Sequence, residues 1–230
     1  MESVFTQKEP NTIQRLFARI AHRYDLANSL LSFGCDSLWR SNVGARVRRW
    51  SPAVILDLAT GSGALAQEFK RQIPAARVVG ADFCGPMLTY ARRRGLTELV
   101  VADGLALPFQ DARFDVVSIA FGLRNMASHD GALREVGRVL RPGGHLVILD
   151  FSLPNPPFRN FYRFYLHHVL PILAGWVTRE PEAYHYLAGT IEEFPKGEAM
   201  LDLLRCCGFI NCQFRPLTMG IVTVYTGQKS

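Results

Sequence analysis

Three acidic residues each stand at or near the end of an apolar run, and the first of them precedes a glycine-rich turn. Asp57 lies in "LDLATGSGALA" (residues 56–66), Asp82 closes "RVVGAD", and Asp103 follows "LVVA". Glycine lets the backbone approach a ligand closely, and the start of the following helix presents free amide donors. Because such runs predict parallel strands, these acids should meet at the carboxyl edge of one sheet and bind a ligand there.

Asp57 helps to decide which of two candidate ligands such a turn would bind. Gly61 and Gly63, with Asp82 at the end of the next strand, also fit a dinucleotide fingerprint. A pyrophosphate would be repelled by Asp57, whereas a cationic ligand would gain a charge-assisted contact. S-adenosylmethionine carries a sulfonium and an ammonium but no phosphate, so the pattern favours it over NAD. A role for Asp57 as a cap of the turn is compatible with either ligand.

The third acid offers contacts for a purine. Asp103 could accept a hydrogen bond from an adenine amino group, and the amide of Gly104 could donate to a ring nitrogen. The alternative is that Asp103 forms an Asx turn, which is common where a strand ends. Three acids at the ends of three successive strands favour the ligand site.

A second group of polar residues follows the apolar run "FDVVSIA". The stretch "FGLRN", residues 121–125, places Arg124 and Asn125 where a buried strand should end. Arginine stays charged in a poorly solvated site and offers a planar fork of donors. Such a cation could lower the pKa of a bound hydroxyl and stabilise the oxyanion that forms. The alternative is an ion pair with a carboxylate such as Asp130 or Glu135.

The order of the elements predicts a single α/β domain over residues 1–230. From residue 53 onward, short β-branched runs alternate with helical stretches, which indicates a doubly wound, Rossmann-like parallel sheet. Near the end, two antiparallel strands meet at Gly220. We divide the chain into an N-terminal helical lid (1–50), a cofactor-binding half (51–152), an aromatic helical lid insertion (153–195) and a C-terminal helix with strands (196–230).

Composition narrows the class of protein. The chain of 230 residues is 48% hydrophobic and 20% charged, with a net charge of +6, as in ordinary globular proteins. Its five cysteines form no CxxC pair and have no zinc spacing, so we expect reduced thiols, a cytoplasmic location and no metal. No signal sequence or run of about 18 apolar residues is present, so we expect a soluble or peripheral protein.

Longer stretches resemble the quinone-biosynthesis C-methyltransferases, the demethylmenaquinone methyltransferase and 2-polyprenyl-1,4-benzoquinol methylase family of class I enzymes. They are "FARIAHRYDLANSLLSFGCDSLWR", "LDLATGSG", "LPFQDARFD", "FGLRN", "EVGRVLRPGGHLVILDFS", "HHVLP" and "YHYLAGTIEEFP". The resemblance implies a seven-stranded sheet whose last strand is antiparallel. It also implies S-adenosylmethionine as methyl donor and a prenylated demethylquinol as acceptor, with demethylmenaquinol favoured and a benzoquinol left open.

The resemblance also implies roles for individual residues. Donor contacts fall on Ser62, Asp82, Asp103 and Gly104. The chain departs from the family pattern where Ala64 removes an acid, which leaves Asp57 more of the contact with the cationic end of the donor. Other departures occur in the glycine loop and beside the acceptor, at Thr60, Ser62, Asp103 and Ala120.

For the acceptor, we expect Arg124 and Asn125 to activate the quinol. Tyr24 and Asp25 would close the site from the N-terminal lid. His168 in "HHVLP" is a candidate general base by residue type, and water held by Asp25 or Asn125 is an equal alternative.

The aromatic stretch over residues 158–176 has three possible roles. It could form a wall of a channel for the prenyl tail, touch a bilayer surface with Arg159 and Arg163 facing the head groups, or pack as a plain lid. We favour the channel wall over plain packing. Peripheral membrane contact and a homodimer are both compatible with the sequence.

Four other functions can be compared with the sequence. "NPPF", residues 155–158, resembles the motif of amino-group methyltransferases that act on nucleic acid, but it follows the fifth strand instead of the fourth. No interleaved basic and aromatic patch supports RNA as substrate, so we expect no nucleic-acid partner. Asp57 disfavours a dehydrogenase. Methylation of another small molecule and donor binding without catalysis stay open, the latter because of Ala64 and Ala120.

Overall fold

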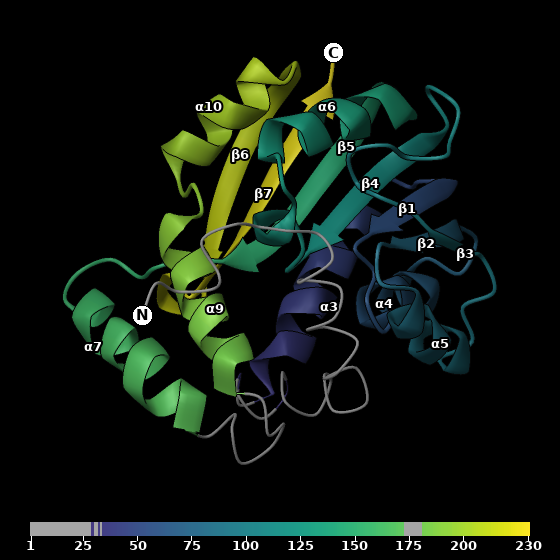
Figure 1. Cartoon of the computed structure of the whole chain (residues 1–230). Coiled ribbons are helices and arrows are strands. Elements are labelled where there is room, and N and C mark those ends of the chain that lie inside the picture. The colour runs from purple at the N-terminus through teal and green to yellow at the C-terminus, as the bar shows by residue number, and fades with distance from the viewer. Residues whose placement is uncertain (1–28, 30–31, 33, 173–180) are drawn as a thin grey trace.

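The structure, a computed structural model, describes residues 29, 32, 34–172 and 181–230 (Figure 1). Seven strands form one sheet in the order β3-β2-β1-β4-β5-β7-β6. β7 runs antiparallel to both of its neighbours, and the other pairings are parallel. The predicted seven-stranded sheet with an antiparallel last strand is therefore confirmed. The strands are β1 (Val54–Leu58), β2 (Arg77–Asp82), β3 (Leu99–Val101), β4 (Phe114–Ala120), β5 (Leu140–Phe151), β6 (Phe209–Leu217) and β7 (Val222–Lys229).

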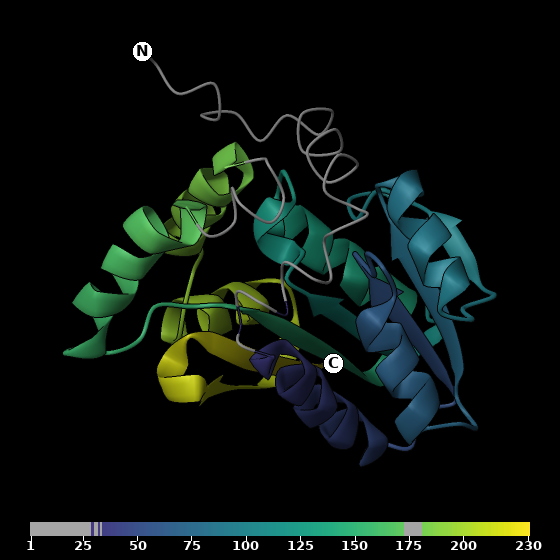
Figure 2. The same cartoon turned by 90° about the horizontal axis from the view of Figure 1, so that it is seen from below.

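Helices cover both faces of this sheet, as the view in Figure 2 shows. One face is packed by α6 (His129–Val139) and α10 (Glu198–Cys206), and the other by α3 (Cys35–Arg48), α4 (Ala64–Gln72) and α5 (Gly85–Arg93). α3 lies within the region expected to form the N-terminal lid, and its buried face belongs to the sheet's helical layer.

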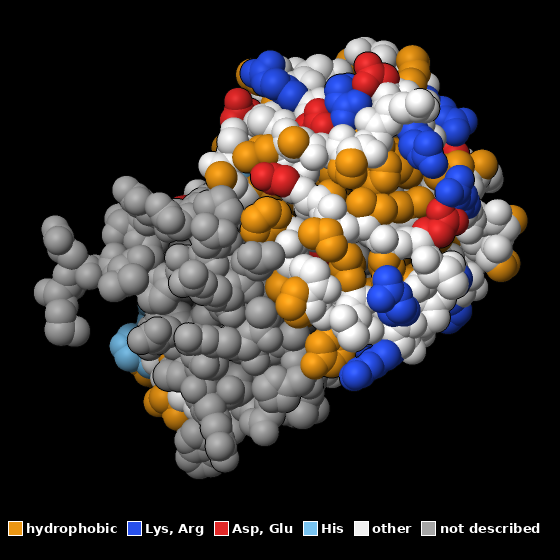
Figure 3. All heavy atoms as spheres, turned by 45° about the vertical axis from the view of Figure 1, so that its right-hand side comes forward, with side chains coloured by type: hydrophobic (Ala, Val, Ile, Leu, Met, Phe, Trp, Pro, Cys, Tyr) orange, Lys and Arg blue, Asp and Glu red, His pale blue; other side chains and the backbone are white. Residues whose placement is uncertain are grey.

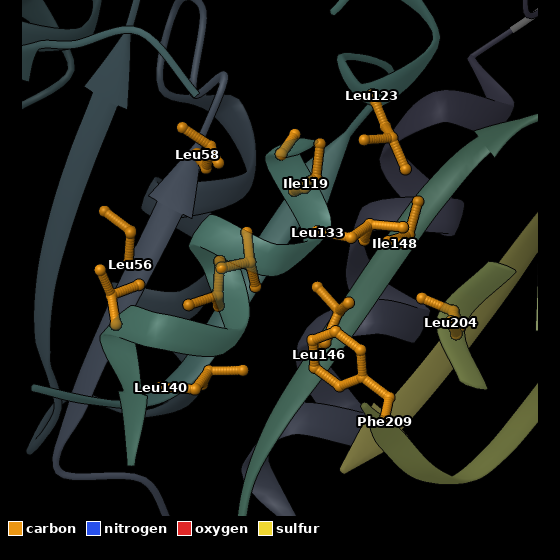
Figure 4. Close-up of a cluster of buried hydrophobic side chains, with 14 of the residues drawn as sticks. Leu56, Leu58, Ile119, Leu123, Leu133, Leu140, Leu146, Ile148, Leu204 and Phe209 are labelled. Carbon is orange, nitrogen blue, oxygen red and sulfur yellow. The ribbon is translucent and has the colours of Figure 1, made fainter. Parts of the chain in front are cut away.

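The two cores follow from alternation along the strands. Leu56 and Leu58 of β1 point into the core under α6 and α10, whereas Ile55 points into the core under α3 and α4. Figure 4 shows the first of these cores, in which Leu133 of α6 lies among side chains of neighbouring strands. Because side chains alternate between faces, a sheet covered on both sides needs near-continuous apolar strands, which is the pattern in the sequence.

The aromatic insertion forms a separate helical layer beside the sheet. α7 (Phe158–Phe164) continues into the π-helical turn η2 (Tyr165–Val169), and α9 (Pro181–Glu193) packs against it. Their shared cluster contains Tyr162, Leu166 and Ile191 and contacts Phe151 at the end of β5. The insertion therefore reaches the carboxyl edge of the sheet, where the predicted site lies.

Candidate active site

The turn between β1 and α4 is built on left-handed backbone conformations. Ala59, Gly61 and Gly63 have φ values of 55°, 57° and 81°. A Cβ atom at Gly63 would lie 2.4 Å from Leu96 Cδ1, whereas at Gly61 its nearest neighbour would be Met87 Cε at 3.5 Å. Gly63 is therefore required for packing against α5, and Gly61 leaves accessible backbone where a ligand can approach.

Asp57 lies fully buried beneath this turn. Its Oδ1 accepts a hydrogen bond from the Ser118 hydroxyl and its Oδ2 accepts one from the Thr60 hydroxyl, each at 2.6 Å. Burial raises the pKa of Asp57 to about 6, the two hydroxyls oppose this rise, and the charge of Asp82 adds to it. Because a nearby cation would favour the ionised form, the carboxylate suits a positively charged ligand better than a phosphate.

Asp82 ties the glycine turn to the end of β2. Its Oδ2 accepts the amide of Gly61 at 2.7 Å, and its Oδ1 accepts the amide of Cys84 at 2.8 Å. Burial raises the pKa of Asp82, and the two amides lower it. Each carboxylate oxygen has a further lone pair, so Asp82 can hold the turn and also accept hydrogen bonds from a diol. Ser62 and Gly63, which complete the turn, are buried.

Asp103 forms the Asx turn that the sequence left as an alternative. Its Oδ1 accepts the amide of Leu105 at 2.9 Å, and the side chain is exposed. Gly104 is buried, and a Cβ atom there would lie 3.0 Å from Met126 Sδ. The turn and a contact with adenine are compatible, since a carboxylate accepts several hydrogen bonds.

Two apolar side chains at this edge were missed by the sequence reasoning. Phe83, directly after Asp82, is 37% exposed, and Val101 at the end of β3 is 61% exposed. A Cβ atom on Gly85 would lie 3.7 Å from Val101 Cγ2, so Val101 borders the start of α5. A large apolar residue directly after the acid of β2 was the available signal, because an aromatic base needs an apolar wall.

Arg124 is held by a buried ion pair. The short 3-10 turn η1 (Leu123–Asn125) places its Nη1 2.6 Å from Asp150 Oδ1 and 2.6 Å from the Phe121 carbonyl. Its Cζ lies 5.4 Å from the centre of the Phe151 ring. The alternative prediction, an ion pair between Arg124 and a carboxylate, is therefore confirmed. The partner it named, Asp130 or Glu135, is wrong, because the carboxylate is that of Asp150. β5 lies next to β4, so the carboxylate at the end of β5 reaches η1 across the sheet.

The ion pair leaves polar atoms without partners. Within the part of the chain that the structure describes, the buried side-chain nitrogen and oxygen atoms without a hydrogen bond are Arg124 Nε, Asn125 Oδ1 and Asp150 Oδ2. An unsatisfied buried polar atom costs about 1–3 kcal/mol. Their concentration in one place indicates a site that a polar ligand or water completes.

This polar site adjoins the glycine turn. A Cβ atom on Gly122 would lie 2.4 Å from the Cβ of Ala59, and Met126 packs on Gly104. The residues on either side of Arg124 and Asn125 therefore contact the loops that carry Asp57 and Asp103. The structure thus places Arg124 and Asn125 beside the loops that carry the predicted donor residues.

Within the aromatic insertion, Tyr162 lies near enough to Arg124 to be affected by its charge, whereas His168 points to the exterior. Tyr162 is buried, and burial raises the pKa of its phenol while the nearby charge of Arg124 opposes the rise. His168 is exposed, stacks on Phe164 and has its Nδ1 3.3 Å from the Phe164 carbonyl. The structure does not bring His168 to Arg124. The predictions for Tyr24 and Asp25 concern residues outside the described ranges.

Three observations bear on other ligand classes. Among the described residues, no group of three or more His, Cys, Asp or Glu side chains could hold a metal ion. None of the described helices is long and apolar enough to cross a membrane. On the face shown in Figure 3, Lys and Arg side chains are dispersed, and acidic side chains lie among them.

Comparison with solved structures shows the fold. A SAM-dependent methyltransferase from Thermotoga maritima, a possible histamine N-methyltransferase, is 17% identical with a TM-score of 0.67, covering 94% of this chain and 99% of that one. Human N-acetylserotonin methyltransferase, in complex with SAM, is 17% identical with a TM-score of 0.62, covering 90% and 56%. At such identities the likeness establishes a shared architecture.

Comparison of sequences is more specific. A demethylmenaquinone methyltransferase from Thermus thermophilus is 46% identical over 222 residues, covering 93% of this chain and all of that protein. A ubiquinone/menaquinone biosynthesis C-methyltransferase from Hahella chejuensis is 39% identical, covering 98% and 94%. The sequence model of the ubiE/COQ5 methyltransferase family matches residues 4–229. The chain belongs to the ubiE/COQ5 methyltransferase family.

Proposed function

We propose that the protein transfers a methyl group from S-adenosylmethionine to a ring carbon of a prenylated demethylquinol, with demethylmenaquinol as the preferred acceptor. The names of its relatives support this assignment. The observation that carries it is the set of unsatisfied buried atoms on Arg124, Asn125 and Asp150, next to a turn suited to a cationic donor. Because such an acceptor resides in a membrane, we place the reaction at its cytoplasmic face.

The donor would be held by the carboxyl ends of the first three strands. Asp57 would face its cationic methionine end, the backbone at Gly61 and Ser62 would approach it closely, and Asp82 would accept its ribose hydroxyls. The chemistry that the donor supplies is a methyl group on a positively charged sulfur. Asp103, Gly104 and Phe83 would border the adenine. The residues present fit this ligand, because buried carboxylates near a cationic sulfonium gain stability in their ionised form.

The acceptor would complete the polar site around Arg124. A quinol hydroxyl that donates to Asp150 Oδ2 satisfies that oxygen. Its O–H bond breaks as the proton passes to Asp150, and the negative charge moves to the quinol oxygen. Arg124, freed from the charge of its carboxylate partner, then stabilises this oxyanion. Asn125 Oδ1 accepts a hydrogen bond from a second hydroxyl or from water.

Ionising the hydroxyl makes the neighbouring ring carbon nucleophilic. That carbon would form the new C–C bond with the donor's methyl group as the C–S bond breaks and the electron pair stays on sulfur. The ring carbon would then pass its own proton to water held by Asn125, which restores the aromatic ring, and Asp150 would return its proton to the quinol oxygen or to water. Tyr24 and Asp25 retain their proposed role of closing the site. His168 has no part in this proposal, since its side chain is exposed on the outer side of its helix.

A methyl-transfer assay with a water-soluble, short-tailed demethylquinol tests the proposal. Removing Arg124 alone would leave the Asp150 charge buried and unpaired, which destabilises a fold by about 3–5 kcal/mol. The informative protein is therefore the double variant Arg124→Gln/Asp150→Asn, which keeps the two side chains polar and uncharged. We expect its turnover to fall at least about 100-fold, with donor affinity within a factor of about two, because no donor contact is removed.

Arg138→Gln is the matched control, because Arg138 also pairs with carboxylates, Glu135 and Asp111, away from the site. Its turnover should stay near that of the unaltered protein. Unchanged turnover in the double variant would overturn the assigned mechanism. Absence of methyl transfer by the unaltered protein, with donor binding intact, would indicate a donor-binding protein without this activity.

A further inference from the structure

The turn that follows β4 contains a strained backbone position. Phe121 comes directly after the last residue of β4 and has a φ of 57°. A left-handed conformation is uncommon for residues other than glycine, and for a bulky side chain it is a genuine outlier. Such strain persists only where the surrounding structure imposes it, and it clusters at active sites. The contacts of Phe121 therefore bear on Arg124 and Asn125, which follow it in the chain.

Neighbouring groups hold Phe121 in this conformation. Its amide donates to the Leu149 carbonyl at 2.7 Å, so the residue is still bound to β5. Its ring centre lies 4.7 Å from that of Phe151. Gly122 packs on Ala59, since a Cβ atom on Gly122 would lie 2.4 Å from the Ala59 Cβ. The amide, the ring and the next residue are thus fixed, and the carbonyl of Phe121 is the group that the turn redirects.

The turn takes the Phe121 carbonyl out of the hydrogen-bond ladder between β4 and β5. If the parallel pairing continued, the next bond would run from the Phe151 amide to the Phe121 carbonyl. The Phe151 amide donates to Asp150 Oδ1 instead, at 2.9 Å. The Phe121 carbonyl accepts two side-chain donors, Arg124 Nη1 at 2.6 Å and Asn125 Nδ2 at 3.4 Å. One carbonyl therefore contacts both residues that we assign to the acceptor.

These contacts decide which atoms of the site stay available. Arg124 Nη1 carries two hydrogens, and its two acceptors are the Phe121 carbonyl and Asp150 Oδ1, each at 2.6 Å. The orientation of the guanidinium is thereby fixed, and its Nε is a buried atom without a partner in the described part of the chain. Asn125 donates through Nδ2, so its Oδ1 is another such atom. Two of the three unsatisfied atoms therefore follow from the position of the Phe121 carbonyl.

We propose that Phe121 is a positioning residue for the acceptor. Its left-handed backbone places the carbonyl that orients Arg124 and Asn125, and this orientation leaves Arg124 Nε and Asn125 Oδ1 for the acceptor's polar groups. The inference rests on the proposed function and extends it to a residue that has no atom in the reaction. The backbone of Phe121 carries this role, and its ring only holds the backbone in place.

Two substitutions at position 121 separate the backbone from the ring. Phe121→Gly and Phe121→Val both remove the ring, but glycine adopts a left-handed conformation freely, whereas branched valine opposes it. With the short-tailed demethylquinol, we expect the turnover of Phe121→Gly to exceed that of Phe121→Val at least about tenfold, because a displaced carbonyl misplaces Arg124. Phe121→Asn, which also tolerates a left-handed conformation, should behave as Phe121→Gly does. Donor affinity should agree within a factor of about two among the three variants.

Phe151 provides the matched control position. Its ring belongs to the same pair, but it lies at the end of β5 and its φ is not positive. Valine suits a strand better than glycine does, so Phe151→Val should exceed Phe151→Gly in both turnover and melting temperature. At position 121 the order of turnover should be reversed. Phe121→Val should also melt no higher than Phe121→Gly, although valine buries more apolar surface.

The reversal between the two positions supports the positioning role. Turnover of Phe121→Val equal to or above that of Phe121→Gly would overturn it. A loss of donor affinity in Phe121→Val that matches its loss of turnover would also overturn it, because the whole site would then be distorted. Failure of the proposed function would look different: the unaltered protein would transfer no methyl group while the melting temperatures still followed the reversed order, and the positioning role would fall with that function.

Discussion

Asp57 is completely buried, and its negative charge is stabilised by hydrogen bonds from the Ser118 and Thr60 hydroxyls and from the backbone at Ala66. Its folded pKa of about 6 lies above its ordinary value of 3.8. A raised carboxyl pKa contributes stability that is fully present below about pH 4 and is lost as the pH rises through 6, a change of about 3 kcal/mol in the free energy of unfolding. The ionised carboxylate that suits the donor therefore destabilises the ligand-free protein.

We predict that Asp57→Asn separates these two effects. Above pH 6 the variant should be more stable than the unaltered protein, by up to about 3 kcal/mol, because no charge is buried. Its donor affinity should fall about tenfold or more and should no longer rise between pH 4 and 6. Urea unfolding and calorimetric titration of the donor at several pH values measure both quantities. A stability difference that does not vary with pH would contradict the assignment of the pKa.

Individual residues also show what the sequence could predict. Asp57, Asp82 and Asp103 were recognised because each stands at or near the end of a strand, and the structure places them at one edge of the sheet. The partner of Arg124 was not recognised, because Asp150 is 26 residues away and becomes a neighbour only through the pairing of β4 with β5. Tyr162 was missed for a similar reason, since nothing local indicates which side of an aromatic helix turns inward.

At the scale of elements, the two glycines of the turn between β1 and α4 have different surroundings. Gly63 lies against Leu96 and Ala91, whereas a Cβ atom on Gly61 would make an ordinary contact with Met87 Cε at 3.5 Å. The sequence predicted the turn and its glycines. It could not assign the packing role of Gly63, because that role depends on how closely α4 and the end of α5 approach each other.

We predict that alanine substitutions at Gly63 and Gly61 impair different properties of the protein, its stability and its donor binding respectively. Gly63→Ala should lower the free energy of unfolding by at least about 3 kcal/mol, because the new Cβ clashes with a packed core and φ is positive. Gly61→Ala should cost about 1 kcal/mol and weaken donor binding instead. Gly95→Ala is the control, since its φ is also positive but a Cβ there meets nothing within 4 Å. Equal donor affinities for the Gly61 and Gly95 variants would contradict the proposed approach of the donor.

At the scale of the whole molecule, one sheet supports two apolar cores. Leu133 lies in the core under α6 and α10, and Phe69 lies in the core under α3 and α4. The near-continuous apolar strands and their alternation with helical stretches predicted this arrangement, because both faces of such strands need to be covered. The sequence did not predict that α3 belongs to this packing, since its apolar residues resemble those of any amphipathic helix.

We predict a single unfolding transition for the domain. Leu133→Ala and Phe69→Ala should each destabilise it by about 2–5 kcal/mol and lower the same melting temperature, because every central strand contributes to both cores. Calorimetry of the two variants and the unaltered protein measures this. Two separate transitions, each sensitive to one substitution, would show that the cores unfold independently.

The buried trio of Arg124 Nε, Asn125 Oδ1 and Asp150 Oδ2 also has a consequence for inhibitor design. An inhibitor that fits this trio needs two hydrogen-bond donors, for Asn125 Oδ1 and Asp150 Oδ2, and one acceptor, for Arg124 Nε. A flat molecule that forms hydrogen bonds with all three atoms would satisfy polar atoms that otherwise lack a partner. Each of these bonds would add more to the affinity than an equivalent bond at a water-exposed site on another protein. The selectivity of such an inhibitor for this protein would come from buried polar atoms that lack a partner. The inhibitor would then not need an adenosine portion.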